Sequence, residues 1–112
     1  MIGVHLLIDG VLHQSVDEEV GRRILSELPA LTGMKVLAGP YVVEGVPENP
    51  GWTGFVIIDK SHISIHTFYE GNKVSIDVFS CKTFDEEVVL RYLEKHLPFK
   101  KMKTRMLERA EE

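Results

Sequence analysis

Residues 53–80 read TGFVIIDKSHISIHTFYEGNKVSIDVFS, and this stretch decides the fold. Three runs within it are rich in Val, Ile, Phe and Thr, which predicts consecutive strands at 53–59, 63–68 and 73–80. The Glu-Gly-Asn sequence at 70–72 predicts a hairpin turn between the last two strands. We therefore expect these strands to pair in an antiparallel sheet.

Alternation along the last two strands separates two different faces, because successive side chains of a strand point to opposite sides. One side is purely aliphatic and consists of Ile63, Ile65, Val74, Ile76 and Val78. The other side is mixed and consists of His62, Ser64, His66, Phe68, Ser75, Asp77, Phe79 and Cys81. The aliphatic side suits packing against helices, whereas the mixed side predicts a solvated surface, a dimer interface or an active-site wall.

One helix is predicted before this stretch and one after it. The first begins at Ser15 and ends near Gly33, with Pro29 expected to kink it or end it early. The second begins at Thr83 and is stopped by Pro98. In both, a glutamate three residues after the hydroxyl residue completes a predicted capping box.

The remaining segments complete the fold class. Further strands are predicted at 3–8, 35–44 and 102–107, and the Pro- and Gly-rich segment 45–52 is predicted to be a loop. The resulting order predicts an α+β two-layer sandwich, in which an antiparallel sheet carries two helices on one face. A length of 112 residues fits a single domain, 1–112.

Composition narrows the class of function. The net charge is -4 and the basic cluster Lys100, Lys101, Lys103 and Arg105 is short, so we expect a solvated strand face and no nucleic-acid partner. No apolar run approaches the roughly 18 residues of a membrane helix, and no signal peptide is visible. Cys81 is the single cysteine, which excludes an intrachain disulfide and favours a cytoplasmic protein.

The residue types around Ser61 allow several kinds of chemistry. Ser61, His62, His66 and Cys81 invite a hydrolase interpretation, but the G-x-S-x-G elbow is absent. Two histidines four apart in a strand lie about 13 Å apart, too far to share one metal directly. No H-x-H or H-E-x-x-H motif is present, so we predict no metal site. From the residues alone, these side chains could be catalytic, or they could be ordinary polar groups whose hydrogen bonds are satisfied.

The order of these motifs resembles the prokaryotic S-adenosylmethionine decarboxylases. That family carries a G-x-x-x-I-x-E-S-H-x-x-x-H-T-W-P-E pattern followed by a D-V-F-x-C strand. The corresponding features here are Ser61-His62, His66-Thr67, Glu70 and Asp77 to Cys81. Gly3, His5 and Asp9 resemble the family's G-x-H-x-x-x-[DE] opening. The resemblance covers nearly the whole chain at near-constant spacing.

The resemblance implies that the chain cuts itself before Ser61. Ser61 would attack the Lys60 carbonyl to convert the amide to an ester, and elimination would then leave a β chain of 1–60 and an α chain of 61–112. The α chain would begin with a pyruvoyl cofactor, whose ketone forms a Schiff base with the substrate and acts as electron sink for decarboxylation. The implied product is decarboxylated S-adenosylmethionine, the aminopropyl donor for spermidine and other polyamines.

The resemblance also implies a role for individual side chains. His66 would be the base that removes the α-proton of the ester, and Cys81 would return a proton to the product carbon. Thr53 stands where close relatives have a serine whose hydroxyl assists cleavage. Three residues are expected near the substrate: Phe68 and Trp52 as aromatic partners of adenine, and Glu70 as a carboxylate.

Departures from the family pattern keep alternatives open. Lys60 stands where close relatives have Glu, and Phe68-Tyr69 replace Trp-Pro. The alternatives are an arginine or ornithine decarboxylase on the same fold, or an uncleaved, non-catalytic relative. The resemblance further implies a homodimer of αβ protomers with sites at the interface.

The expected strand pairing places Cys81, but not His66, near the cleavage point. If Phe68 pairs with Lys73, Lys60 lies opposite Cys81, beside the cleavage point. His66 lies up to about 16 Å from Ser61 along an extended strand. A bulge, a bent strand or a twofold partner must close that gap.

Overall fold

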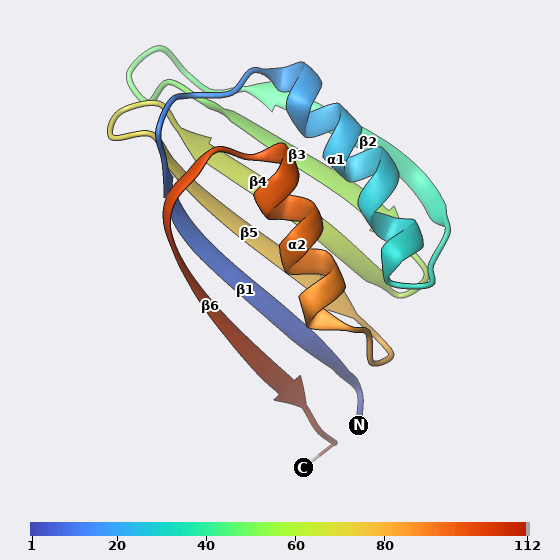
Figure 1. Ribbon diagram of the computed structural model, residues 1–112. Coiled ribbons are helices and arrows are strands. Elements are labelled where there is room, and N and C mark those ends of the chain that lie inside the picture. The colour runs from blue at the N-terminus through green and yellow to red at the C-terminus, as the bar shows by residue number, and fades with distance from the viewer. Residues whose placement is uncertain (112) are drawn as a thin grey trace.

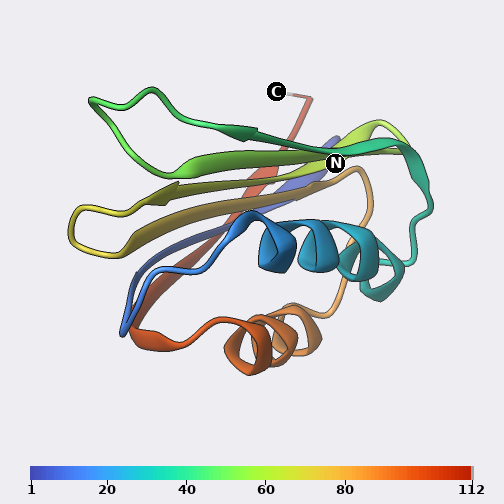
Figure 2. The same cartoon turned by 90° about the horizontal axis from the view of Figure 1, so that it is seen from above.

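The computed structural model describes residues 1–111. Its elements are, in chain order, β1 (Gly3–Leu12), α1 (Glu18–Leu31), β2 (Val36–Glu44), β3 (Trp52–Ile58), β4 (Ser61–Phe68), β5 (Lys73–Ser80), α2 (Glu86–His96) and β6 (Phe99–Arg109). All paired strands are antiparallel, in the order β2-β3-β4-β5-β1-β6. Both helices lie on one face of this sheet (Figures 1 and 2), which confirms the predicted two-layer α+β sandwich.

The strands follow the predicted pattern, and their register fixes which residues are neighbours. Phe68 pairs with Lys73 across the β4–β5 turn, as predicted. The aliphatic side faces the helices, where Ile63 and Ile65 are fully buried with α1 and α2 residues such as Leu28 and Leu93. The core therefore lies between the sheet and the two helices.

The helix starts differ from the prediction. Asp17, not Ser15, caps α1 by accepting a hydrogen bond from the Val20 N–H (3.3 Å), and Asp85, not Thr83, caps α2. The Ser15 hydroxyl instead donates to the side chain of Asn72 (2.7 Å). An aspartate is at least as good an N-cap as serine, and its charge also complements the positive end of the helix dipole.

The face away from the helices, called here the open face, has no other element of residues 1–111 packed over it (Figure 2). Strand register arranges its side chains in rows that cross the sheet. One row is His5–Phe79–His62–Ile57, the next Leu7–Asp77–Ser64–Phe55, and the third Asp9–Ser75–His66–Thr53. These rows carry His62, His66 and Asp77 of the predicted mixed side, and β1 adds His5 and Asp9 to them.

Trp52 fastens α1 to the sheet at the start of β3. Its side chain is 2% exposed, and its indole N–H donates to the Val16 carbonyl (2.9 Å). Gly21 of α1 faces the ring so closely that a Cβ there would lie 2.5 Å from a ring carbon. The absence of a side chain at Gly21 is therefore what allows the helix to approach Trp52.

We predict that Gly21→Ala lowers the free energy of unfolding by about 1 to 2 kcal/mol, because overpacking a rigid buried ring costs more than the helix propensity of alanine returns. Ser26→Ala on the exposed side of α1 is the matched control and should be neutral or slightly stabilising. Urea unfolding at one fixed protein concentration measures both. A Gly21→Ala protein as stable as the control would contradict this packing.

Candidate active site

A tight turn places strain directly before Ser61. β3 and β4 are joined by Asp59 and Lys60 alone, since Ile58 pairs with Ser61. Lys60 has a backbone φ of 51°, in the left-handed region that residues other than glycine rarely occupy. The carbonyl of this strained residue forms the peptide bond to Ser61.

The Ser61 hydroxyl is held between two backbone groups. Ser61 is only 6% exposed, and its Oγ donates to the Asp59 carbonyl (2.8 Å) and accepts from the Cys81 N–H (2.8 Å). The Cys81 Sγ lies 3.5 Å from the same Asp59 carbonyl oxygen. Asp59, Lys60, Ser61 and Cys81 form what we call the cleavage group. A hydroxyl, a thiol and a backbone N–H therefore lie together at the turn that contains the Lys60–Ser61 bond.

His66 and Thr53 form a second group, the histidine group, on the open face. They pair across β3 and β4, with Thr53 Oγ1 and His66 Nδ1 2.9 Å apart. Pairing runs without a register shift from Ile58–Ser61 to Thr53–His66, so no bulge brings the two groups together. Five strand residues correspond to about 16 Å. The predicted site residues therefore fall into two groups within one chain.

A third cluster on the open face has no role in the sequence-based interpretation. Asp77 lies between two histidines, 2.9 Å from His5 Nδ1 and 3.6 Å from His62 Nε2. The Phe79 ring centroid is 4.5 Å from that of His5 and 5.5 Å from that of His62. His5 and Asp77 both belong to quoted motifs, which was the available signal. Their cross-strand proximity became visible only with the register.

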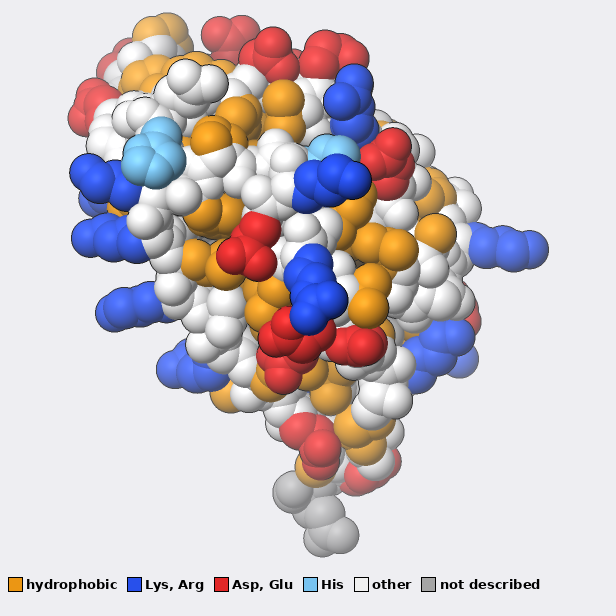
Figure 3. All heavy atoms as spheres, in the orientation of Figure 1, with side chains coloured by type: hydrophobic (Ala, Val, Ile, Leu, Met, Phe, Trp, Pro, Cys, Tyr) orange, Lys and Arg blue, Asp and Glu red, His pale blue; other side chains and the backbone are white. Residues whose placement is uncertain are grey.

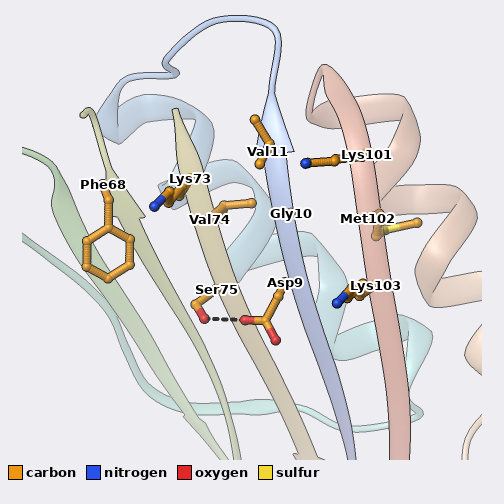
Figure 4. Close-up of a pocket in the computed structure, with 10 residues that line it drawn as sticks. All are labelled: Asp9, Gly10, Val11, Phe68, Lys73, Val74, Ser75, Lys101, Met102 and Lys103. Carbon is orange, nitrogen blue, oxygen red and sulfur yellow. Dashed lines mark hydrogen bonds between the residues drawn. The ribbon is translucent and has the colours of Figure 1, made fainter. Parts of the chain in front are cut away.

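The three residues expected near the substrate are in different environments. Phe68, 37% exposed, lines an open-face cavity of about 590 Å³ (Figure 4). Glu70 is exposed in the β4–β5 turn. Both follow His66 and so lie far along the chain's own sheet from Ser61. Trp52 faces the helices and is buried, so its ring is not available to a ligand, and the expectation for Trp52 is not supported.

The basic cluster near the end of the chain is exposed, as expected for a solvated strand face. Lys101 and Lys103 extend from β6 over β1 at the cavity that Phe68 lines, where Ser75 donates to Asp9 (2.6 Å) (Figure 4). From the helix side, Lys and Arg side chains project along the margin that β6 forms, whereas both signs of charge are interspersed elsewhere (Figure 3). The basic residues of β6 thus form a charged margin of the sheet, and further Lys and Arg side chains lie elsewhere on this face.

Residues 1–111 contain no group of three or more His, Cys, Asp or Glu side chains placed to hold a metal ion. None of the helices within these residues has both the length and the apolar character needed to cross a bilayer.

Comparison with known proteins identifies the fold and then the family. The structure of the adenosylmethionine decarboxylase from Aquifex aeolicus VF5 superposes with a TM-score of 0.80 at 24% identity, covering 99% of this chain and 95% of that one. It shares the two-layer fold. A model of the S-adenosylmethionine decarboxylase family matches residues 5–110.

Relatives in sequence agree with that assignment. An S-adenosylmethionine decarboxylase proenzyme of Clostridium botulinum (strain Langeland) is 40% identical over 96% of this chain and 94% of its own. The proenzyme of Persephonella marina is 32% identical over 97% and 83%, respectively. The chain belongs to the S-adenosylmethionine decarboxylase family, as the sequence resemblance predicted.

We predict that relieving the strain at Lys60 slows the self-cleavage that the resemblance implies. Glycine adopts a positive φ at no steric cost, so Lys60→Gly should slow cleavage about five- to tenfold by stabilising the uncleaved chain. Lys60→Glu keeps the strained φ and should stay within about twofold of the wild type. Gel or mass analysis of the two fragments against time measures both rates. A faster Lys60→Gly protein would exclude strain as a driving force.

Proposed function

We propose that residues 1–112 form a single-domain proenzyme that cleaves itself between Lys60 and Ser61 and then decarboxylates S-adenosylmethionine. The observation that carries the proposal is the Ser61 hydroxyl, fixed between the Asp59 carbonyl and the Cys81 N–H directly after the strained Lys60. The names of the curated relatives, which are proenzymes, support it. The product would supply aminopropyl groups for spermidine and other polyamines.

The cleavage step uses groups that lie at the Lys60–Ser61 bond. Ser61 Oγ attacks the Lys60 carbonyl carbon, its proton passes to the leaving nitrogen, the C–N bond breaks, and that nitrogen becomes the Ser61 amine. The Cys81 N–H donates to Oγ and so fixes the position of the attacking oxygen before the reaction starts. Removal of the Ser61 α-proton then expels the Lys60 carboxylate. Loss of ammonia with addition of water leaves a pyruvoyl group at residue 61.

The pyruvoyl ketone would condense with the substrate amine and withdraw electrons during decarboxylation, the chemistry that such a cofactor supplies. Cys81 lies beside Ser61 and would donate the proton that replaces carbon dioxide. His66 would remove the α-proton of the ester. When its Nδ1–H donates to Thr53 Oγ1, the Nε2 lone pair is free to accept that proton.

A homodimer would bring the two groups together. About 16 Å of uninterrupted strand separates Ser61 from His66 in one chain. Ser61 follows the buried side of β4 with Ile63 and Ile65, so it can be reached only at the end of the β3–β4 hairpin. We infer that the open face of each protomer packs over the β3–β4 turn of the other, so that His66 and Thr53 of one subunit reach Ser61 of the other. The exposed apolar side chains on this face support the inference: Tyr41, Val43, Ile57 and Leu107 are each at least 40% exposed. Phe68 and Glu70 would then contact a substrate held between the subunits.

The role proposed for Cys81 bears on the cellular compartment of the protein. A catalytic thiol must stay reduced, which favours a reducing compartment such as the cytoplasm.

Denatured intact mass is the direct test of the proposed proenzyme. We expect two species, residues 1–60 and residues 61–112 with a pyruvoyl start, and carbon dioxide released from carboxyl-labelled S-adenosylmethionine. Ser61→Ala should remain one chain without activity. If labelled carbon dioxide is released only from arginine or ornithine, that amino acid is the substrate and S-adenosylmethionine is not. One persistent wild-type species of 12.7 kDa would instead mean a stalled precursor or a non-catalytic relative.

A mixing experiment tests the shared site. Ser61→Ala and His66→Ala chains should each fail to cleave alone, because each site lacks one essential group. When the two are co-expressed, a mixed dimer contains one complete site, built from Ser61 of the His66→Ala chain and His66 of the Ser61→Ala chain. We therefore expect cleavage of the His66→Ala chain only, with mass labels to tell the chains apart. Failure of complementation in verified mixed dimers would show that His66 acts within its own subunit.

A further inference from the structure

Ser80 places a buried hydroxyl on the side of β5 that is otherwise aliphatic. Val74, Ile76 and Val78 of β5 face the helices, and Ser80 continues this side with 0% exposure. A hydroxyl at such a position is costly unless its hydrogen bonds are made inside the protein. The partners of Ser80 therefore indicate why a polar residue is there.

Those partners belong to the turn that follows β5. Ser80 Oγ donates to the Lys82 carbonyl (2.6 Å) and accepts from the Lys82 N–H (3.2 Å). The backbone of Cys81 is thereby enclosed between Ser80 and Lys82. The Lys82 ammonium group donates to the Gly33 carbonyl (3.3 Å), which anchors the turn to the segment after α1.

The turn determines where both polar groups of Cys81 point. Its N–H donates to Ser61 Oγ at 2.8 Å, and its thiol lies 3.5 Å from the Asp59 carbonyl oxygen. An N–H that holds an attacking oxygen in place must be positioned before the reaction starts, because a misplacement of about 1 Å at a reacting group can slow a reaction about 100-fold. The hydroxyl of Ser80 supplies that positioning without touching the reacting bond.

We propose that Ser80 is a positioning residue for self-cleavage, acting through the Cys81 N–H on the conversion of the Lys60–Ser61 amide to an ester. The inference rests on the proposed function and deepens it. It assigns Ser80 to ester formation and not to the later proton removal by His66.

Threonine and valine provide a matched pair of replacements, because they have nearly the same shape and only threonine has the hydroxyl. We expect Ser80→Thr to cleave at close to the wild-type rate and Ser80→Val at least tenfold more slowly. Ser80→Ala, which adds no volume, is a second variant without the hydroxyl and should behave like Ser80→Val. Unfolding by urea is measured for all three variants.

Hydroxylamine separates ester formation from the later step. In a His66→Ala background the ester should accumulate. Hydroxylamine attacks its Lys60 carbonyl and breaks the acyl–oxygen bond, giving a Lys60 hydroxamate and an α chain that begins with serine. Adding Ser80→Val or Ser80→Ala should slow this hydroxylamine cut at least tenfold, whereas adding Ser80→Thr should not. A residue with only a structural role would lower stability without this selective loss.

Each outcome decides between the proposals. If wild type cleaves and the valine and alanine variants cleave as fast as the threonine variant, the role of Ser80 is wrong and the proposed function stands. If the valine and alanine variants cleave at the wild-type rate, but yield less cleaved protein overnight in proportion to their lower stability, Ser80 is a structural residue. If the wild type never cleaves and hydroxylamine does not cut the His66→Ala chain, both proposals fail.

Discussion

The register of the β3–β4 hairpin is the constraint on which the rest of the site depends. Only Asp59 and Lys60 connect the two strands, so Ile58 must pair with Ser61 and every later pair follows. The β4–β5 turn extends that register to β5, which ends where Cys81 can donate to Ser61. The same regularity holds His66 five residues away, opposite Thr53. One geometric rule thus assembles the cleavage group and separates it from the histidine group.

This division explains why one face of the sheet stays uncovered. A two-layer protein needs only one buried sheet face for its core, and the row from Ile63 to Val78 meets that need beneath the helices. The open face is left free to carry His5, His62 and Asp77 in contact with each other, a combination that would be costly inside an apolar core. The histidine and carboxylate side chains are therefore on the opposite side of these strands from the packed core, whereas Ser61 and Ser80 lie on the buried side.

Sequence patterns predicted the parts of the structure that depend on local rules. Period-two alternation identified both faces, and the Glu70 turn gave the β4–β5 register, from which the proximity of Cys81 to the cleavage point followed. Helix caps were misplaced because several capping residues stand close together and only tertiary packing chooses among them. The burial of Trp52 depends on the missing side chain of Gly21, thirty-one positions earlier in the chain, which no local pattern reveals. The left-handed φ of Lys60 is likewise set by the two strands that the turn must join.

The cleavage region departs from the rules that stabilise the rest of the fold. A lysine occupies a conformation suited to glycine, and a buried serine interrupts the aliphatic side of β5. Each departure costs stability, yet both surround the same bond, and the hydroxyls of Ser61 and Ser80 each both donate and accept a hydrogen bond. Asn72 in the β4–β5 turn also has a positive φ of 52°, but asparagine adopts this conformation more readily than lysine does. Within the described chain no buried side-chain nitrogen or oxygen lacks a partner. Strain combined with complete hydrogen bonding is the arrangement expected where a backbone is held in place in order to react.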